Sequence, residues 1–128
     1  MSIIILGSTG YLGKNLKNYF KKNKINAFYT KRFENKPNED EIYFDLAKKS
    51  SWENILNLKP NIIINCIAYG VVKDEIDLKT MYNINYFLLR DFFTYINTRT
   101  NLFWLQVGTA FEYDLNRIDI DESTPCSP

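Results

Sequence analysis

The sequence predicts an α/β fold built on a parallel sheet of about five strands. Short runs rich in β-branched and aromatic residues alternate with amphipathic helical patterns, which is typical of βαβ units. Residues 61–68 form an almost unbroken apolar run, as expected of a strand covered on both faces of a parallel sheet. The chain has 128 residues and 45% of them are hydrophobic, which is enough to bury one core. We therefore expect a single domain over residues 1–128.

Three strands and two helices are expected in the first half of the chain. The strands cover residues 2–6, 25–30 and 41–44. The first helix starts near Leu12, because apolar side chains recur from there at helical spacing, opposite a row of lysines. The second helix follows Ser50 and Ser51, in the pattern of a serine cap ahead of Trp52, and ends at Pro60.

One long helix and two further strands are expected in the second half. The strands cover residues 61–68 and 102–107, and the helix covers residues 80–97. The apolar residues of this helix form a wide stripe that consists of Met81, Ile84, Leu88, Leu89, Phe92, Phe93 and Ile96. A polar tail over residues 119–128 follows the last strand.

The composition excludes several kinds of chemistry. The chain has no histidine, so Ser-His-Asp triads, Cys-His pairs and histidine-based zinc sites are ruled out, and we expect no metal site. Cys66 and Cys126 form no CxxC pair. The 16 Lys and Arg residues nearly balance the 15 Asp and Glu residues, and there is no apolar run of about 18 residues. We therefore expect no nucleic-acid partner, no membrane association and a cytoplasmic location.

A glycine-rich turn separates the first strand from the first helix. It reads Gly7, Ser8, Thr9, Gly10, Tyr11, Leu12 and Gly13. Gly7 would permit a tight turn, Gly10 the close approach of a pyrophosphate, and Gly13 close packing of the helix on the strand. Because the N–H groups and dipole of a helix N-terminus favour phosphate, these seven residues are predicted to bind a dinucleotide. A plain structural turn is the alternative, and a P-loop is excluded because no Gly-Lys-Ser/Thr ends the motif.

Further motifs follow in order along the chain. They are Asp45 and Leu46 after the third strand, Ile67, Ala68, Tyr69 and Gly70 after the fourth, Asn85 in the long helix, and Val107 and Thr109 at the end of the fifth strand. Together with the Gly-x-x-Gly-x-x-Gly spacing, this series resembles the extended short-chain dehydrogenase/reductases, the NAD(P)-dependent epimerase/dehydratase family that acts on nucleotide sugars. The resemblance spans the whole chain and implies a Rossmann-like doubly wound sheet.

The resemblance also implies a role for each segment. The glycine turn and the residues of the later motifs, Thr109 excepted, are implied as cofactor contacts. Thr109 is implied as a catalytic residue, whose hydroxyl both donates and accepts hydrogen bonds as an alcohol becomes a ketone. A structural threonine at a strand end is the alternative reading of Thr109.

The end of the second strand bears on the choice between the two cofactors. Thr30, Lys31 and Arg32 stand there, and no acidic residue follows until Glu34. An acid at this place would bind the ribose 2′-OH of NAD, whereas a nearby Arg accommodates the 2′-phosphate of NADP. We therefore predict that these three residues contact the cofactor and that NADP is preferred over NAD. The alternative is that Lys31 and Arg32 are merely solvated charges.

Members of the family transfer a hydride at a sugar carbon with a Tyr-x-x-x-Lys pair, which the family pattern places just beyond Pro128. They are commonly at least twice as long as this chain, with a C-terminal part that binds the nucleotide-sugar substrate. We therefore expect an incomplete NAD(P)-binding portion of a nucleotide-sugar epimerase or 4-ketoreductase, truncated before the later strands and without turnover on its own. The alternative is a non-catalytic NAD(P)-binding module, or a truncated relic, that acts as a sensor or scaffold.

Three residues after Thr109 bear on the type of reaction. Dehydration is disfavoured, because Ala110 and Phe111 stand where the family's dehydratases carry an acid and a base. Alternation along the strand points Glu112 away from the face of Thr109.

The apolar stripe of residues 80–97 is wider than one sheet face needs, and relatives often pair this helix across a dimer. A homodimer through this helix is therefore expected, with simple cover of the sheet as the alternative.

Overall fold

The computed structural model of the chain describes residues 1–32, 38–70, 76–109, 113 and 119–126. Its strands form one parallel five-stranded sheet in the order β3-β2-β1-β4-β5. They are β1 (Ile3–Leu6), β2 (Phe28–Lys31), β3 (Glu41–Tyr43), β4 (Ile62–Asn65) and β5 (Phe103–Gln106). The predicted α/β class and parallel five-stranded sheet are confirmed, and the strand order is that of a Rossmann-like doubly wound fold.

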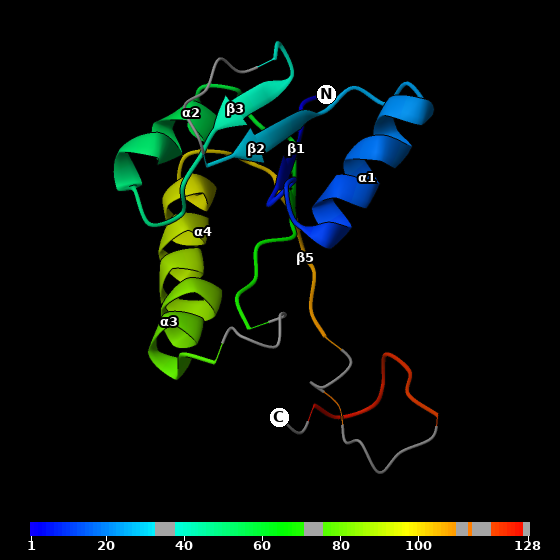
Figure 1. The fold of residues 1–128 in the computed structure, drawn as a ribbon, viewed down its shortest axis with the longest axis vertical. Helices are drawn as coiled ribbons and strands as arrows, with labels where there is room; N and C mark the ends of the chain where they lie inside the picture. Colours follow the sequence, from blue (N-terminus) through cyan, green and yellow to red (C-terminus); the bar gives the residue numbers. More distant parts are fainter. Residues whose placement is uncertain (33–37, 71–75, 110–112, 114–118, 127–128) are drawn as a thin grey trace.

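Helices lie on both faces of the sheet (Figure 1). α1 (Tyr11–Lys22) lies on one face, and α2 (Trp52–Leu56) and α4 (Leu89–Asn97) lie on the other. The crossovers from β1 to β2 and from β4 to β5 run in opposite directions along the sheet. Because such crossovers are right-handed, their helices must cover opposite faces.

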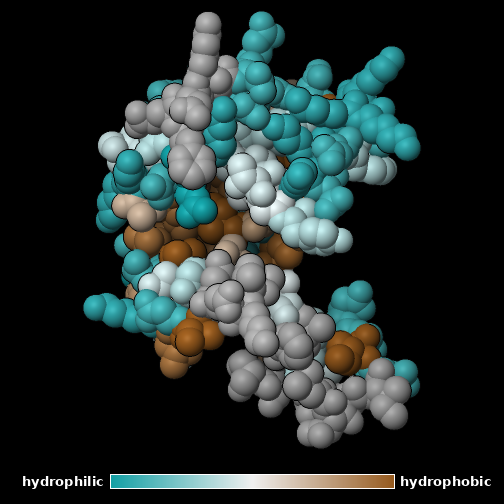
Figure 2. Space-filling view, in the orientation of Figure 1, coloured by the Kyte–Doolittle hydropathy of each residue, from teal (hydrophilic) through white to brown (hydrophobic). Residues whose placement is uncertain are grey.

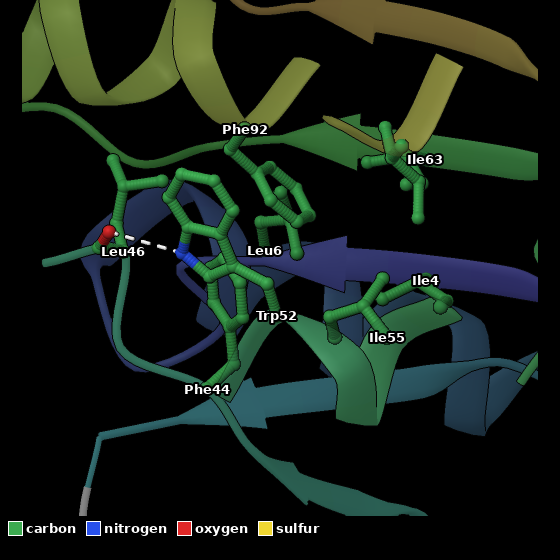
Figure 3. Packing of buried hydrophobic residues seen from close by; sticks show 9 residues of the cluster. Ile4, Leu6, Phe44, Leu46, Trp52, Ile55, Ile63 and Phe92 are labelled. Carbon is green, nitrogen blue, oxygen red and sulfur yellow. Dashed lines mark hydrogen bonds between the residues drawn. The ribbon is translucent and has the colours of Figure 1, made fainter. Parts of the chain in front are cut away.

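The main core fills the space between the sheet and helices α2 and α4 (Figure 3). Phe92 of α4 is fully buried, with its ring centroid 4.9 Å from that of Phe44 and 5.3 Å from that of Trp52. The indole N–H of Trp52 donates to the carbonyl of Leu46 at 3.1 Å. The core therefore also fixes the chain where it leaves β3.

β4 is covered more completely on one face than on the other. Ile63 is fully buried towards α4, whereas Ile62 and Ile64 remain partly exposed on the face that carries α1, where Phe103 of β5 is 64% exposed. Figure 2 shows apolar side chains gathered in the middle of the view, below a hydrophilic surface over α1, β2 and β3. The expected complete cover of residues 61–68 is therefore wrong for one face, and the strand itself ends at Asn65.

The long helix begins earlier than predicted and is less regular. α3 (Leu78–Tyr82) starts the helix, and the Asp77 side chain caps it by accepting a hydrogen bond from the backbone N–H of Lys79 at 3.1 Å. The π-helical segment η2 (Asn83–Leu88) then joins α3 to α4. A π-helical segment shifts the register of the side chains around the helix by one residue. The predicted apolar stripe is so wide that it does not reveal this shift.

Two shorter elements also differ from the prediction. β2 begins at Phe28 rather than at Ile25, because the backbone N–H of Ile25 donates to the carbonyl of Phe20 and so belongs to the end of α1. The predicted serine capping bond of α2 is absent. A 3-10 turn, η1 (Lys49–Ser51), precedes α2, and the buried Ser51 hydroxyl instead accepts from the backbone N–H of Asp45 at 3.0 Å.

Glu41 joins three elements near the edge of the sheet. Its carboxylate accepts hydrogen bonds from Lys17 of α1 at 2.7 Å, from Lys31 of β2 at 3.0 Å and from the backbone N–H of Asn38 at 3.3 Å. The Glu41 side chain is only 14% exposed. The Lys17 and Lys31 ammonium groups and this N–H stabilise the charged form and lower the pKa of Glu41 to about 2.

This network predicts a dependence of stability on pH. The folded-state pKa of Glu41 lies below its ordinary value of 4.5. Its contribution to the free energy of unfolding is therefore fully present above about pH 4.5 and is lost as the pH falls towards about 2. We expect Glu41→Gln to be less stable than the wild type at neutral pH, and the difference to close over that acidic window. Urea unfolding followed by tryptophan fluorescence at several pH values measures this, with the exposed Glu39→Gln as control. A difference that stayed constant down to the acid limit would contradict the assignment.

Candidate functional site

The carboxyl ends of all five strands meet at one edge of the sheet. In the neighbouring strands β1, β4 and β5 the last paired residues are Leu6, Asn65 and Gln106, which lie side by side. The glycine turn and the segments that follow β2, β3, β4 and β5 therefore leave the sheet together. In a doubly wound sheet, ligands bind at this edge, where the strand order reverses between β1 and β4. The structure thus brings the predicted site segments to one place.

The glycine turn leaves no room for side chains at two of its three glycines. Gly7 has φ +72°, and a Cβ there would lie 2.9 Å from the backbone carbonyl of Cys66. A Cβ on Gly13 would lie 2.3 Å from the Gly7 carbonyl oxygen. The start of α1 is therefore seated directly on the turn and on the chain that leaves β4.

Gly10 is different, because the space beside it is open. A Cβ there would meet only the Gly7 carbonyl oxygen, at 3.4 Å. Gly10 is also the N-cap of α1, and α1 has neither a side-chain capping bond nor an acidic residue in its first turn. Its first N–H groups and the positive end of its dipole are thus available to an anion. The turn therefore fits a pyrophosphate group.

The side chains of Ser8 and Thr30 hold this turn from inside. The Thr30 hydroxyl accepts a hydrogen bond from the backbone N–H of Gly7 at 3.0 Å, and the Ser8 hydroxyl donates to the Thr30 carbonyl at 2.7 Å. Both residues are buried, whereas Thr9, Tyr11 and Leu12 are exposed. The hydroxyls of Ser8 and Thr30 therefore act on the shape of the turn.

The two basic residues after Thr30 face different surroundings. The Lys31 ammonium is paired with Glu41 and its side chain is 19% exposed. Arg32 is exposed at the end of β2. The structure therefore separates two charges that are adjacent in the sequence.

Asp45 and Leu46 are fixed where the chain leaves β3. The Asp45 backbone N–H is held by Ser51, and its carboxylate accepts from the backbone N–H of Ala47 at 3.0 Å. Leu46 is buried in the core, 6% exposed. Asp45 is half-buried at the edge of the sheet, and Leu46 packs beneath it.

Asn85 clamps the segment after β4 to the long helix. Its side-chain amide accepts from the backbone N–H of Tyr69 and donates to the carbonyl of Tyr69, both at 2.8 Å. Gly70 follows with φ +91°, and a Cβ there would lie 2.5 Å from the terminal methyl of Met81. The segment of Ile67, Ala68, Tyr69 and Gly70 is therefore held against η2 and α3.

Asn65 is a site residue that the sequence analysis missed. It is fully buried at the end of β4, donates to the Gln106 side chain at 3.0 Å and accepts from the backbone N–H of Ile67 at 3.2 Å. These bonds fix the exits of β4 and β5 together. The signal was one polar residue inside the apolar run 61–68.

Val107 and Thr109 follow β5 at the same edge. The backbone N–H of Val107 donates to the Asn65 carbonyl at 3.2 Å, and the Thr109 residue is exposed. Ala110, Phe111 and Glu112, on which the argument about dehydration rests, lie outside the described residues.

One Tyr-x-x-x-Lys spacing does occur in the chain, at Tyr69 and Lys73. It stands after β4 rather than after the acidic stretch where the family pattern places it. Two residues four apart meet on one side only within a helix, and the positive φ of Gly70 interrupts any helix directly after Tyr69. This spacing therefore differs in place from the family's catalytic pair, and Lys73 lies outside the described residues.

The described part of the chain shows neither a metal site nor a membrane span. It contains no group of three or more His, Cys, Asp and Glu side chains placed to hold a metal ion. Among the described helices, none is long and apolar enough to cross a membrane.

Solved structures share this fold at low sequence identity. A short-chain dehydrogenase/reductase superfamily protein from Agrobacterium tumefaciens with bound NAD matches with a TM-score of 0.78 and 14% identity, over 100% of this chain and 39% of that one. Helicobacter pylori ADP-L-glycero-D-manno-heptose-6-epimerase matches with a TM-score of 0.77 and 17% identity, over 99% and 44%. A hypothetical dTDP-4-dehydrorhamnose reductase from Sulfolobus tokodaii matches with a TM-score of 0.71 and 21% identity, over 100% and 46%. The chain thus spans less than half the length of each of these proteins.

The family comparison covers almost every residue. The model of the NAD dependent epimerase/dehydratase family matches residues 3–128, which include the glycine turn, all five strands and the segments that follow them. The chain therefore belongs to the NAD-dependent epimerase/dehydratase family.

Proposed function

We propose that residues 1–128 form the NAD(P)-binding portion of a nucleotide-sugar epimerase or 4-ketoreductase. The observation that carries this proposal is the cradle made by the glycine turn and the uncapped start of α1, at the edge where the strand order reverses. Two of the similar structures are, by name, an epimerase and a reductase of nucleotide-activated sugars. When bound, the nicotinamide ring supplies the hydride acceptor and donor.

Each segment of the edge has a part in this proposal. Gly10 and the N–H groups of α1 bind the pyrophosphate, Asp45 and Leu46 lie towards the adenine end, and the segment after β4 supports the remainder of the dinucleotide. Thr109 orients the oxygen of the reacting sugar carbon by hydrogen bonding. Cys66 and Cys126 are both free thiols, which fits a reducing compartment and supports a cytoplasmic location.

Binding of the cofactor can be tested with a pair of glycine variants. A Cβ on Gly10 meets only one protein atom, at 3.4 Å, so Gly10→Ala should fold normally but narrow the cradle. We expect it to weaken binding of NADH and NADPH about tenfold or more, the size of a steric penalty of one methyl group in a tight site. Calorimetric titration measures this, with the exposed Asn18→Ala on α1 as matched control. Gly13→Ala should instead lower the free energy of unfolding, because its Cβ meets backbone at 2.3 Å. Unchanged affinity in folded Gly10→Ala protein would contradict the site.

The same titration tests the choice between the two cofactors. We propose that NADP is preferred, and with Lys31 paired to Glu41 this preference rests on the exposed Arg32. NADPH should bind more tightly than NADH, and the reverse order would overturn the preference.

The 128-residue chain by itself should show no turnover. Thr109 can orient a substrate oxygen, but no tyrosine-lysine pair follows it on a helix among the described residues. Spectrophotometric and chromatographic assays with nucleotide sugars and NAD(P) should detect neither reduction nor epimerisation, and any activity above background would contradict this. Binding without turnover also fits a non-catalytic NAD(P)-binding module. A Tyr-x-x-x-Lys pair shortly after Pro128 in the parent gene would favour the enzyme.

The long helix also carries a surface that suits a homodimer. Leu78, Tyr82, Tyr86 and Phe93 are exposed at helical spacing along α3, η2 and α4, by 64%, 63%, 54% and 37%. Three of these side chains are aromatic: Phe93 packs edge-on against Trp104 of β5 at 5.2 Å, and the Arg90 guanidinium lies over the Tyr86 ring at 5.4 Å. An exposed apolar stripe of this kind is typical of an interface.

We therefore expect the chain to be dimeric in light-scattering measurements at micromolar concentration. Tyr86→Glu should shift it to the monomer, because a charge would be buried in the interface. Tyr19→Glu, on the exposed face of α1, is the matched control and should leave the dimer intact. A monomeric wild type would count against this interface.

A further inference from the structure

Lys31 stands next to the predicted dinucleotide site with its backbone firmly held. It is the last residue of β2, directly after Thr30, whose hydroxyl supports the glycine turn. Its carbonyl accepts a hydrogen bond from the backbone N–H of Phe44 at 2.9 Å. Only the side chain of Lys31 is therefore able to move relative to the turn.

That side chain points away from the carboxyl edge of the sheet. Along β2, Lys31 shares a face with Tyr29, and Tyr29 is paired in register with Glu41. Lys31 itself is in register with Tyr43, two residues further towards the carboxyl edge. The ion pair with Glu41 thus draws the Lys31 ammonium back towards the amino ends of the strands.

The ion pair is shielded from solvent, so it holds Lys31 firmly. The Lys31 and Glu41 side chains are 19% and 14% exposed, with the charged atoms 3.0 Å apart. Lys17 binds the other carboxylate oxygen at 2.7 Å and is 20% exposed. An ion pair of low exposure is screened less by salt than a surface pair, and removal of one partner frees the other.

We propose that Glu41 is a specificity-determining positioning residue, which limits the preference for NADP by holding Lys31 away from the 2′ position of the adenosine ribose. The inference rests on the proposed NAD(P)-binding function. With Lys31 held back, Arg32 is the described cation at the end of β2 that faces the 2′-phosphate, and the site accepts both NAD and NADP. Glu41 does not touch the cofactor and acts only through Lys31.

Once Lys31 is released from Glu41, its side chain is suited to attract a 2′-phosphate. Its ammonium is a point charge on a flexible four-carbon stem, so loss of Glu41 lets it turn towards the carboxyl edge without a change in the backbone. A phosphate monoester at the 2′ position carries about 1.5 to 2 negative charges at neutral pH. NADP gains this attraction and NAD does not.

The test is the ratio of the dissociation constants of NADH and NADPH, measured by calorimetric titration of the full chain. Glu41→Gln should raise this ratio about three- to fivefold towards NADPH, the size of one solvent-exposed ion pair. The gain should disappear in the double variant Glu41→Gln, Lys31→Gln. It should also shrink at high salt, which a purely structural effect of the substitution would not do.

Two single variants complete the design. Lys17→Gln removes the other ion pair of Glu41 but keeps Lys31 bound, so it should leave the ratio unchanged. Lys31→Gln alone should also leave the ratio of the two dissociation constants unchanged. This variant tests the proposal even if Glu41→Gln fails to fold. A loss of NADPH preference in Lys31→Gln, or an unchanged ratio in folded Glu41→Gln protein, would overturn the inference. Failure of the wild type to bind either dinucleotide would instead overturn the proposed function.

Discussion

The contact between the glycine turn and the chain that leaves β4 is the constraint on which the site depends. Gly7 lies so close to the Cys66 carbonyl that no side chain fits, and Gly13 lies closer still to the carbonyl of Gly7. These two contacts set the position of α1 relative to β1 and β4, and so place the free N–H groups of α1 over the point where the strand order reverses. Thr30 and Ser8 add hydrogen bonds from β2, which fixes the turn from its other side.

Much of this arrangement could be predicted from the sequence, because it follows from local rules. The alternation of apolar runs with helical patterns predicted the parallel sheet of about five strands, and the glycine spacing predicted the turn between the first strand and the first helix. The rest depends on individual hydrogen bonds and on packing that the sequence pattern does not reveal. The Ser51 hydroxyl is pulled from its expected helix cap to the backbone of Asp45, and Ile25 ends α1 through a bond to Phe20. The incomplete cover of β4 depends on which faces the helices occupy, and no single segment encodes that.

Lys31 and Arg32 show most clearly that the pairing of charges could not be predicted from the sequence. In the sequence they are adjacent cations with the same expected role. Strand alternation places Lys31 on the face of α1, where Glu41 lies in register with Tyr29 two residues back, and this ion pair spans ten residues of sequence. The register of the sheet decides which residue pairs with a charged side chain. A cofactor preference predicted only from the residues at a strand end therefore counts Lys31 as available, although Glu41 already neutralises it.

The edge is also built with neutral amides where its segments must be joined. Asn85 binds the backbone of Tyr69 through both of its polar atoms, and Asn65 joins the exits of β4 and β5 through Gln106 and Ile67. An amide carries a donor and an acceptor without net charge, so it can satisfy backbone groups without the desolvation cost of an ion. It also adds no fixed charge beside a ligand that carries several phosphate charges. Among the described charged residues near this edge, Lys31 is paired with Glu41, the Asp45 carboxylate accepts from the backbone N–H of Ala47, and Arg32 is exposed. The described part of the edge therefore joins its loops through neutral amides, and it leaves the exposed Arg32 at the end of β2 for the electrostatic selection of a ligand.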